Sequence, residues 1–358
     1  MHSAVSTLVS NMFDPLALPC DCPIPNISRF SSGRKFVQNS INPNPVTHYP
    51  SSIYTHNRVM IDTGIAGMWP LIAAHIGQHD ITDCILTHHH EDHSGNICNI
   101  LTSNYHHLYP SPHNPPALPN VVKIWTSEGC LKILNPTGEH SPVFPMQFYE
   151  HFLYGKPSKW TIDTPDHPLS DYHPLSYPPN FAAESLKLNI IPGTLTLHDT
   201  TYHVHEARGH SPDQIAIHCP SANVFFSGDA YLSPETFFFR SDEDYDNATA
   251  TMRRMIATPD WDGLLCGHMP VYKDGKEALK RKLEQHEANG VRIRELHAGG
   301  MAEEDIAAVI FPRATKQWPL FVFCGGDVSP DNIIRSCIHG GSHRSGVSKA
   351  LKNTTLLL

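Results

Sequence analysis

The chain has 358 residues, 40% of them hydrophobic, and a formal net charge of −9 at pH 7. A chain of this length can bury one large core or two small ones. The acidic balance argues against a nucleic-acid partner, which usually requires a basic surface, and no stretch approaches the roughly 18 apolar residues of a membrane span.

The N-terminal residues 1–38 are rich in Pro and Ser and show little periodicity, so we predict an irregular segment that wraps the domain surface. The first residues lack both the charged start and the long apolar stretch of a signal peptide. Nine cysteines, an odd number, are scattered along the chain, which favours free thiols in a reducing compartment. We therefore expect a cytoplasmic protein.

The first predicted strands lead directly to polar residues. A strand over Arg58–Ile61 ends at Asp62, and a helix is predicted over Met68–His79. The next strand, Thr82–Thr87, runs into four potential metal ligands within six residues, namely His88, His90, Asp92 and His93. Imidazole and carboxylate groups bind zinc and other divalent first-row metals well, and crowding them together is costly unless something satisfies them. This cluster predicts a metal site at the end of a strand.

The middle of the chain predicts little regular structure. Residues 97–120 are loop-like because of their prolines, followed by a strand over 121–125 and a short helix over 128–134. We expect an insertion over about residues 100–185, with a further helix at 145–154. Two interpretations stay open: a segment that covers the substrate, or a surface subdomain whose aromatic side chains fill its own core. Those side chains are Phe144, Phe148, Tyr149, Phe152 and Trp160.

In the second half, polar residues again follow strand-like segments. Strands are predicted over 195–197, 202–205, 214–218, 224–226 and 264–266. His210 follows a glycine in a turn, Asp229 follows an apolar strand, and His268 follows the last strand. Helices are predicted over 242–258, 276–296 and 303–311. The second helix mixes Lys and Arg with Glu, so we expect a solvated face rather than a nucleic-acid surface.

Asp62, the His88–His93 cluster, His210, Asp229 and His268 occur in the order of the five motifs of the metallo-β-lactamase-fold hydrolase superfamily, which this chain resembles over roughly residues 39–297. The closer resemblance is to glyoxalase II and β-lactamase-like protein 2, through the segments 42–45 and 209–212 and the charged helix after His268. The resemblance implies an α/β protein with a four-layer αβ/βα sandwich. The catalytic domain would span 39–274, followed by a helical C-terminal region over 275–315 and a tail of uncertain structure over 316–358.

The resemblance also implies two divalent metal ions, with zinc as our first choice and iron or manganese as alternatives, because no thiolate is among the expected ligands. His88, His90 and His210 would bind the first metal. Asp92, His93 and His268 would bind the second, and Asp229 would bridge them. Asp62 would orient the ligand loop without touching a metal. His89 departs from the usual aromatic residue, and we expect it to point away from the site.

The expected function is metal-dependent hydrolysis. A hydroxide shared by two metals, its pKa lowered from about 15.7 towards about 7, would attack the carbonyl of a thioester, lactone or amide, with Asp92 accepting and donating the proton. The alternatives are a metal-dependent endoribonuclease and a mononuclear iron enzyme resembling persulfide dioxygenases. The acidic charge of the chain disfavours the endoribonuclease. The complete ligand set for a second metal, Asp92, His93 and His268, disfavours the mononuclear iron enzyme. We expect a small-molecule or thioester substrate, with no membrane partner. The pattern does not indicate an oligomeric state.

Overall fold

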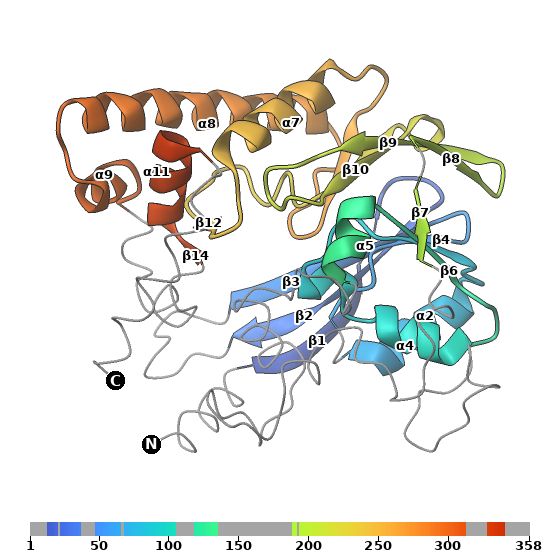
Figure 1. Cartoon of the computed structure of the whole chain (residues 1–358). Helices are drawn as coiled ribbons and strands as arrows, with labels where there is room; N and C mark the ends of the chain where they lie inside the picture. Colours follow the sequence, from blue (N-terminus) through green and yellow to red (C-terminus); the bar gives the residue numbers. More distant parts are fainter. Residues whose placement is uncertain are drawn as a thin grey trace, which may run out of the picture.

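The computed structural model describes residues 13–20, 22–36, 47–65, 68–104, 118–134, 188–191, 193–312 and 328–340. The strands of these ranges build two main sheets that pack face to face (Figure 1). Within the described ranges, no helix combines the length and apolar character that a membrane crossing requires.

The larger sheet has seven strands in sequence order. The first four pair antiparallel and the last four pair parallel, with β4 common to both sets. The strands are β1 (Phe13–Cys20), β2 (Ile27–Phe36), β3 (Thr47–His56), β4 (Val59–Ile61), β5 (Asp83–Ile85), β6 (Lys123–Thr126) and β7 (Leu188–Ile190).

The smaller sheet has five strands in the order β13-β11-β10-β9-β8, and only the β11–β13 pair is parallel. Its strands are β8 (Thr194–Leu197), β9 (Thr200–Glu206), β10 (Ile215–Cys219), β11 (Val224–Gly228) and β13 (Gly263–Cys266). A separate two-stranded pair joins β12 (Phe239–Arg240) to β14 (Val328–Ser329).

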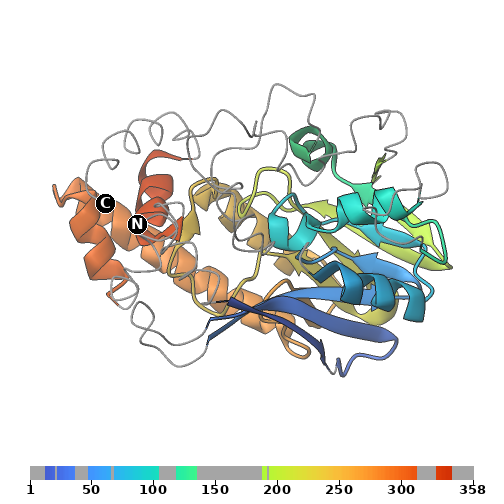
Figure 2. The ribbon, with the colours of Figure 1, turned by 90° about the horizontal axis from the view of Figure 1, so that it is seen from below.

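Helices cover the outer face of each sheet. On the large sheet lie α2 (Trp69–Gln78), α4 (Ile97–Asn104) and α5 (Glu128–Leu134), and on the small sheet lie α7 (Tyr245–Ala257) and α8 (Gly275–Ala298). Figure 2 shows the first group from below. The short helix α3 (Glu91–Ser94) lies in the predicted ligand loop. These elements form the four-layer sandwich that the resemblance implied.

The alternation of side chains along the strands explains the layers. In β4, Met60 packs with α2 and α4, whereas Val59 and Ile61 face the other sheet. In β11, Phe226 faces the large sheet and Phe225 packs under α7 and α8. Because successive residues of a strand point to opposite faces, strands that are apolar throughout must be covered on both sides.

Three expectations about organisation are wrong in part. Residues 13–20 and 27–36 of the supposedly irregular N-terminal segment form the paired strands β1 and β2. Pro15 and Pro19 obscured β1, but proline is tolerated in an edge strand because no neighbour needs its N–H. Residues 97–104, predicted as loop, form α4. Within the supposed insertion, β6 lies between β5 and β7 in the large sheet, so 123–134 belong to the core architecture.

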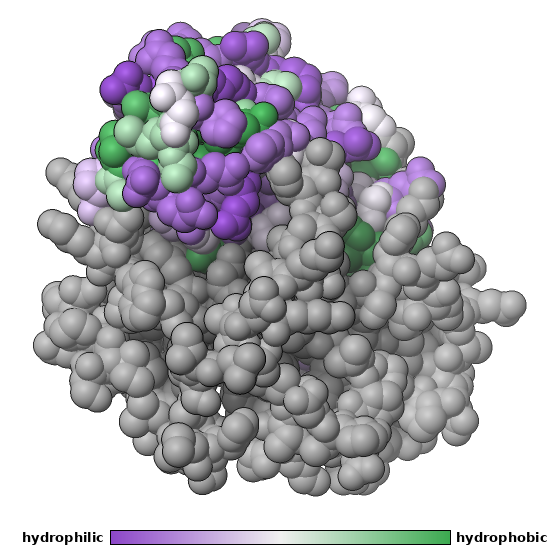
Figure 3. All heavy atoms as spheres, turned by 60° about the vertical axis from the view of Figure 1, so that its left-hand side comes forward, coloured by the Kyte–Doolittle hydropathy of each residue, from purple (hydrophilic) through white to green (hydrophobic). Residues whose placement is uncertain are grey.

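The predicted helix at 145–154 and the aromatic side chains of the insertion lie outside the described residues. In the tail, β14 and α11 (Pro330–His339) are regular, and α11 packs with α9 (Glu303–Ile310) against α8. Figures 1 and 2 both show α9 and α11 at one end of the molecule. The described part of that end mixes hydrophilic and hydrophobic residues on its surface (Figure 3).

Candidate metal centre

The ligand loop begins where β5 ends and is fixed by buried hydrogen bonds from neighbouring segments. The Asp62 carboxylate accepts the backbone N–H of Thr87 at 2.7 Å, just before the first histidine. The backbone N–H of Thr63 donates to the carbonyl of His93 at 2.7 Å. Ser51 Oγ donates to the carbonyl of Asp92 at 2.6 Å. The loop that carries four of the predicted ligands is thus held by β3 and by the segment after β4.

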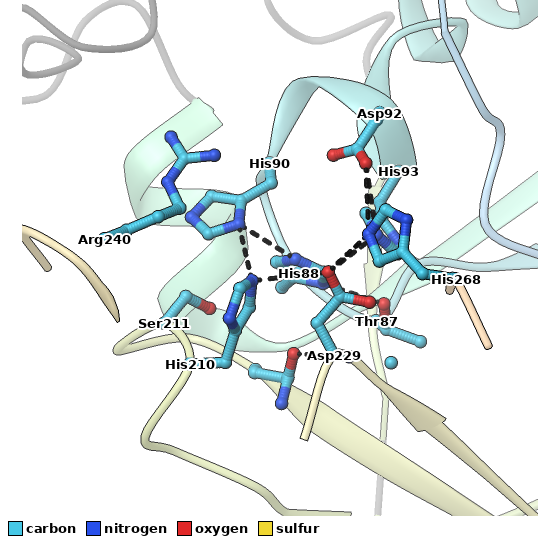
Figure 4. A network of polar contacts seen from close by, with 12 residues as sticks. Thr87, His88, His90, Asp92, His93, His210, Ser211, Asp229, Arg240 and His268 are labelled. Carbon is cyan, nitrogen blue, oxygen red and sulfur yellow. Dashed lines mark hydrogen bonds and ion pairs between the residues drawn. The ribbon is translucent and has the colours of Figure 1, made fainter. Parts of the chain in front are cut away.

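Three histidines converge in what we call the three-histidine cluster, formed by His88, His90 and His210 (Figure 4). Nε2 of His88 lies 3.1 Å from Nδ1 of His90, which lies 3.0 Å from Nε2 of His210. All three residues are buried, and His210 reaches the site from the turn between β9 and β10. Their facing nitrogens leave a shared point that a cation can occupy.

A second set, here called the Asp92 cluster, consists of Asp92, His93 and His268. Nε2 of His268, which follows β13, lies 3.5 Å from Oδ2 of Asp92. Asp229, at the end of β11, stands between the two clusters: its Oδ2 lies 3.0 Å from Nε2 of His268, 3.3 Å from Nε2 of His93 and 3.4 Å from Nε2 of His210. The structure therefore brings all seven predicted ligands together.

The chemistry of these residues fits divalent metals. A third group, His88, His93 and Asp229, overlaps both clusters, because it shares His88 with the three-histidine cluster and His93 with the Asp92 cluster. Within each of the three groups the ligand atoms lie within 4.8 Å of one another. Asp92 Oδ2 and His93 Nε2 are buried and make no hydrogen bond of good geometry within the described part of the chain. Buried polar atoms without a partner are costly, and a bound cation would satisfy both of them.

The electrostatics of the site favour metal-binding forms at several ligands. Burial, reinforced by neighbouring imidazoles, holds the pKa of His88 well below its usual value, and burial beside Arg240 does the same for the pKa of His90. Burial opposes the ionisation of Asp229, but His268 and His93 hold its pKa well below the usual range. Neutral imidazole and ionised carboxylate are the forms that coordinate cations.

His93 and His268 have the opposite tendency. Burial would lower the pKa of His93, but Asp229, Asp92 and Asp62 raise it well above its usual value. The pKa of His268 is also raised, because Asp229 and Asp92 outweigh its burial. A cation entering the Asp92 cluster must therefore compete with protons.

Asp62 lies behind the ligands rather than among them, since its Oδ2 is 2.8 Å from Nδ1 of His93, the nitrogen that faces away from the Asp92 cluster. His89 is buried beside the site. Its Nδ1 is 2.7 Å from Oδ1 of Asp213, a carboxylate that also accepts the backbone N–H of His89 at 2.9 Å and the hydroxyl of Ser211 at 2.7 Å. Asp213 thus ties the two ligand-bearing loops together.

Sequence reasoning missed Asp213, although it follows the Gly-His-Ser-Pro motif by one residue. It also missed Arg240, Asp242 and Glu243, which border the three-histidine cluster. Asp242 was only a helix start in our prediction. The available signal was a pair of adjacent acids just before the helix cap Asp244, but such pairs are common at helix starts.

A cavity of about 30 Å³ lies behind His210 and Asp229, with room for about one water. Lys282 of α8 borders it, although we predicted this residue on a solvated face. It is buried, and its Nζ donates to the Ser233 carbonyl at 2.9 Å and to Thr236 Oγ1 at 2.8 Å. Burial lowers the pKa of Lys282 to about 8. The charge pattern of α8 could not reveal which lysine faces inward.

Comparison with known proteins points to one family. The model of the family described as the metallo-beta-lactamase superfamily matches residues 54–283. No curated protein sequence gives a significant match.

Three solved structures with similar folds share 12–16% sequence identity with the chain. A metallo-beta-lactamase family protein from Thermus thermophilus is 15% identical, with a TM-score of 0.48 and 94% of each chain covered. A beta-lactamase domain protein from Burkholderia ambifaria is 16% identical, with a TM-score of 0.46, covering 91% of this chain and 86% of that one. A double mutant of the sec-alkyl sulfatase PisA1 is 12% identical, with a TM-score of 0.53, covering 99% of this chain and 54% of that one. At such identities the likeness concerns the fold alone.

Proposed function

The chain belongs to the metallo-β-lactamase superfamily, and we propose that it is a binuclear metal-dependent hydrolase of a carbonyl substrate such as a thioester, lactone or amide. One observation carries the proposal: seven buried ligand residues form overlapping groups whose ligand atoms lie within 4.8 Å of one another. The three-histidine cluster would hold one metal and the Asp92 cluster the other, with Asp229 shared. Bound divalent metals would supply an acidified water and polarise the carbonyl oxygen.

The residues of the chain have separate tasks in this proposal. Asp92 is buried, and its Oδ2, which makes no hydrogen bond within the described residues, faces Nε2 of His268. Its carboxylate is therefore placed to take the proton of the attacking water and return it to the leaving group. Asp62 holds His93, and Asp213 fixes the backbone between two ligands of the three-histidine cluster. Water exclusion comes from the surrounding burial, since Thr87, Ser94 and Gln214 are buried as well.

Zinc is our proposed metal. Iron and manganese are the alternatives, because the clusters offer nitrogen and oxygen ligands but no sulfur that would select zinc over them. The finer kinship with glyoxalase II and β-lactamase-like protein 2 is also proposed. A cytoplasmic location is supported by free thiols at Cys22, Cys84, Cys130, Cys219, Cys266 and Cys337.

The test combines metal analysis of the purified chain with a panel of thioester, lactone, β-lactam and RNA substrates. We expect about two metals per chain and carbonyl cleavage that a chelator removes and added zinc or manganese restores. Asp92→Asn should lose turnover more severely than metal. One metal per chain, unchanged in Asp92→Ala, would contradict the binuclear proposal and favour the mononuclear iron alternative.

The ribonuclease alternative depended on the basic residues of α8. Several of these pair within the chain: Lys280 with Glu277, Arg292 with Glu295 and Arg294 with Asp246. Because these basic side chains already have acidic partners, the pairing supports a carbonyl substrate over RNA. If the ribonuclease alternative were right, the logarithm of the RNA affinity would fall with the logarithm of the salt concentration, with a slope of about −0.7 per phosphate contact. We expect instead that the chain binds no RNA at physiological salt. Our choice would be reversed if the chain bound RNA tightly and cleaved it with a metal, and if the double substitution Lys280→Glu with Arg281→Glu abolished that binding.

A further inference from the structure

Two adjacent acids lie against the outer edge of the three-histidine cluster. Oδ2 of Asp242 is 3.4 Å from Nε2 of His90, and Oε2 of Glu243 is 3.4 Å from Nδ1 of His210. The other nitrogens of the two rings, Nδ1 of His90 and Nε2 of His210, are 3.0 Å apart and face the shared point of the cluster. The two acids therefore contact the nitrogens that point away from it. Each acid therefore contacts a ligand ring from behind.

The segment 240–243 that carries these acids is fixed from several sides. The backbone N–H of Arg240, at the end of β12, donates to Oε1 of Glu243 at 2.8 Å. The Glu243 carbonyl accepts from Ser336 Oγ of α11 at 3.2 Å. Asp244 then caps α7 by accepting the N–H of Asn247 at 2.8 Å. The position of Glu243 is set by β12, α7 and α11 together.

The turn that carries His210 is fixed to the same segment. The backbone N–H of Asp244 donates to the Gly209 carbonyl at 2.7 Å. Gly209 has φ +139°, and a Cβ there would lie 2.4 Å from Cα of Ala248. Only glycine permits this approach of the turn to the first residues of α7. Consequently, Glu243 and His210 keep their relative position because their chain neighbours, Asp244 and Gly209, are joined by a backbone hydrogen bond.

We propose that Asp242 and Glu243 are positioning residues that set the ring orientation and basicity of His90 and His210, and so determine the metal affinity of the three-histidine cluster independently of the Asp92 cluster. A carboxylate that accepts the second N–H of a ligand histidine fixes its tautomer and strengthens it as a donor. Asp62 lies at the shorter distance of 2.8 Å from the outward nitrogen of His93 in the Asp92 cluster, so each cluster has its own acids. The inference rests on the proposed metal-dependent function.

Metal titration of metal-free protein tests the inference. Asp242→Asn and Glu243→Gln keep the size of each side chain and remove its charge. We expect each substitution to weaken one of two zinc-binding steps by about 10- to 100-fold, measured by competition with a chelator, and to leave the other step unchanged. Asp62→Asn should weaken the other step. The matched control is Asp246→Asn in α7, an exposed acid whose partner is Arg294, which should change neither step.

Nitrogen NMR of zinc-loaded, 15N-histidine-labelled protein distinguishes positioning from a general structural role. We expect protonated Nε2 in His90 and protonated Nδ1 in His210, and a changed signal for the corresponding ring in each variant. Unaltered affinity and ring signals in both variants would overturn the inference, as would equal weakening of both steps. If the wild-type chain bound no metal, the proposed function itself would fail first. Should Glu243→Gln not fold, the partly exposed Asp242 still provides the test.

Discussion

The carboxylate of Asp62 lies 2.8 Å from Nδ1 of His93, and its other oxygen accepts the N–H of Thr87 at 2.7 Å. This single side chain therefore fixes both the start of the ligand loop and the ring of one of its ligands. The backbone of Asp62 has φ +65°, in the left-handed region that few residues other than glycine adopt, although Asp adopts it more often than most.

Replacing Asp62 with Ala should weaken metal binding by about 10- to 100-fold while the chain still folds, because the acid supports a ligand without being one. Zinc competition with a chelator measures the affinity, and circular dichroism of the metal-free protein checks the fold. A loss of metal as complete as that caused by removing a ligand would show that Asp62 coordinates directly.

Asp229→Ala should disturb both clusters at once. Its Oδ2 lies within 3.4 Å of ligand nitrogens from His93, His210 and His268, so its removal takes a shared negative ligand from both clusters. We expect metal content to fall below one per chain, and activity to fall by about 10³-fold or more, since bound metals contribute several kcal/mol to the transition state. A variant that keeps two metals would contradict a bridging role.

A methyl group at Gly267 should damage the site more than the fold. A Cβ there would lie 2.3 Å from Oδ1 of Asp229 and 2.6 Å from Cε1 of His93. The backbone cannot shift easily, because the Gly267 carbonyl accepts from the N–H of Ser52 at 2.6 Å. We expect Gly267→Ala to cost about 1–3 kcal/mol of stability and to reduce metal content.

Gly193→Ala is the matched control for this substitution, because a Cβ at Gly193 meets nothing within 4 Å. Thermal unfolding and elemental analysis of both variants provide the comparison. Equal metal content in the two proteins would mean that the ligands near Gly267 can rearrange without loss.

The residues that converge at the candidate site could be chosen from the sequence because they are local and follow strands, and the resemblance assigned their roles as ligands. His88, His90 and His93 lie within one loop, and Asp229 and His268 each follow an apolar strand whose ends meet at the same edge of the sandwich. The helices α7 and α8 were predicted to within a few residues, since their ends carry clear signals, and the structure confirms both.

What the sequence could not reveal depends on contacts between distant segments. Glu243 reaches His210 only because the segment before α7 packs on the turn after β9. Lys282 lies in a run of charged residues like the solvated lysines of α8, yet it is buried and donates to Ser233 and Thr236. The strands β1 and β2 lack strong alternation, and the pairing of β1 to β2 and of β2 to β3 is a property of the completed sheet.

The buried His286 of α8 should make stability depend on pH. Its ring stacks on Tyr245 with centroids 4.0 Å apart, and burial lowers its pKa to about 4. In the unfolded chain a histidine binds a proton with a pKa of about 6.5. The neutral ring therefore contributes stability above about pH 6.5, and this contribution is lost as the pH falls towards 4.

Glutamine at position 286 removes this proton linkage, so the stability difference between wild type and His286→Gln should narrow by about 2 kcal/mol when the pH falls from about 7.5 to about 5. Denaturant unfolding of the metal-free proteins at the two pH values measures the difference. His297→Gln, on an exposed position of the same helix, is the matched control. A difference for His286→Gln that stays constant between the two pH values would mean that the ring is protonated, or exposed to water, in the folded chain.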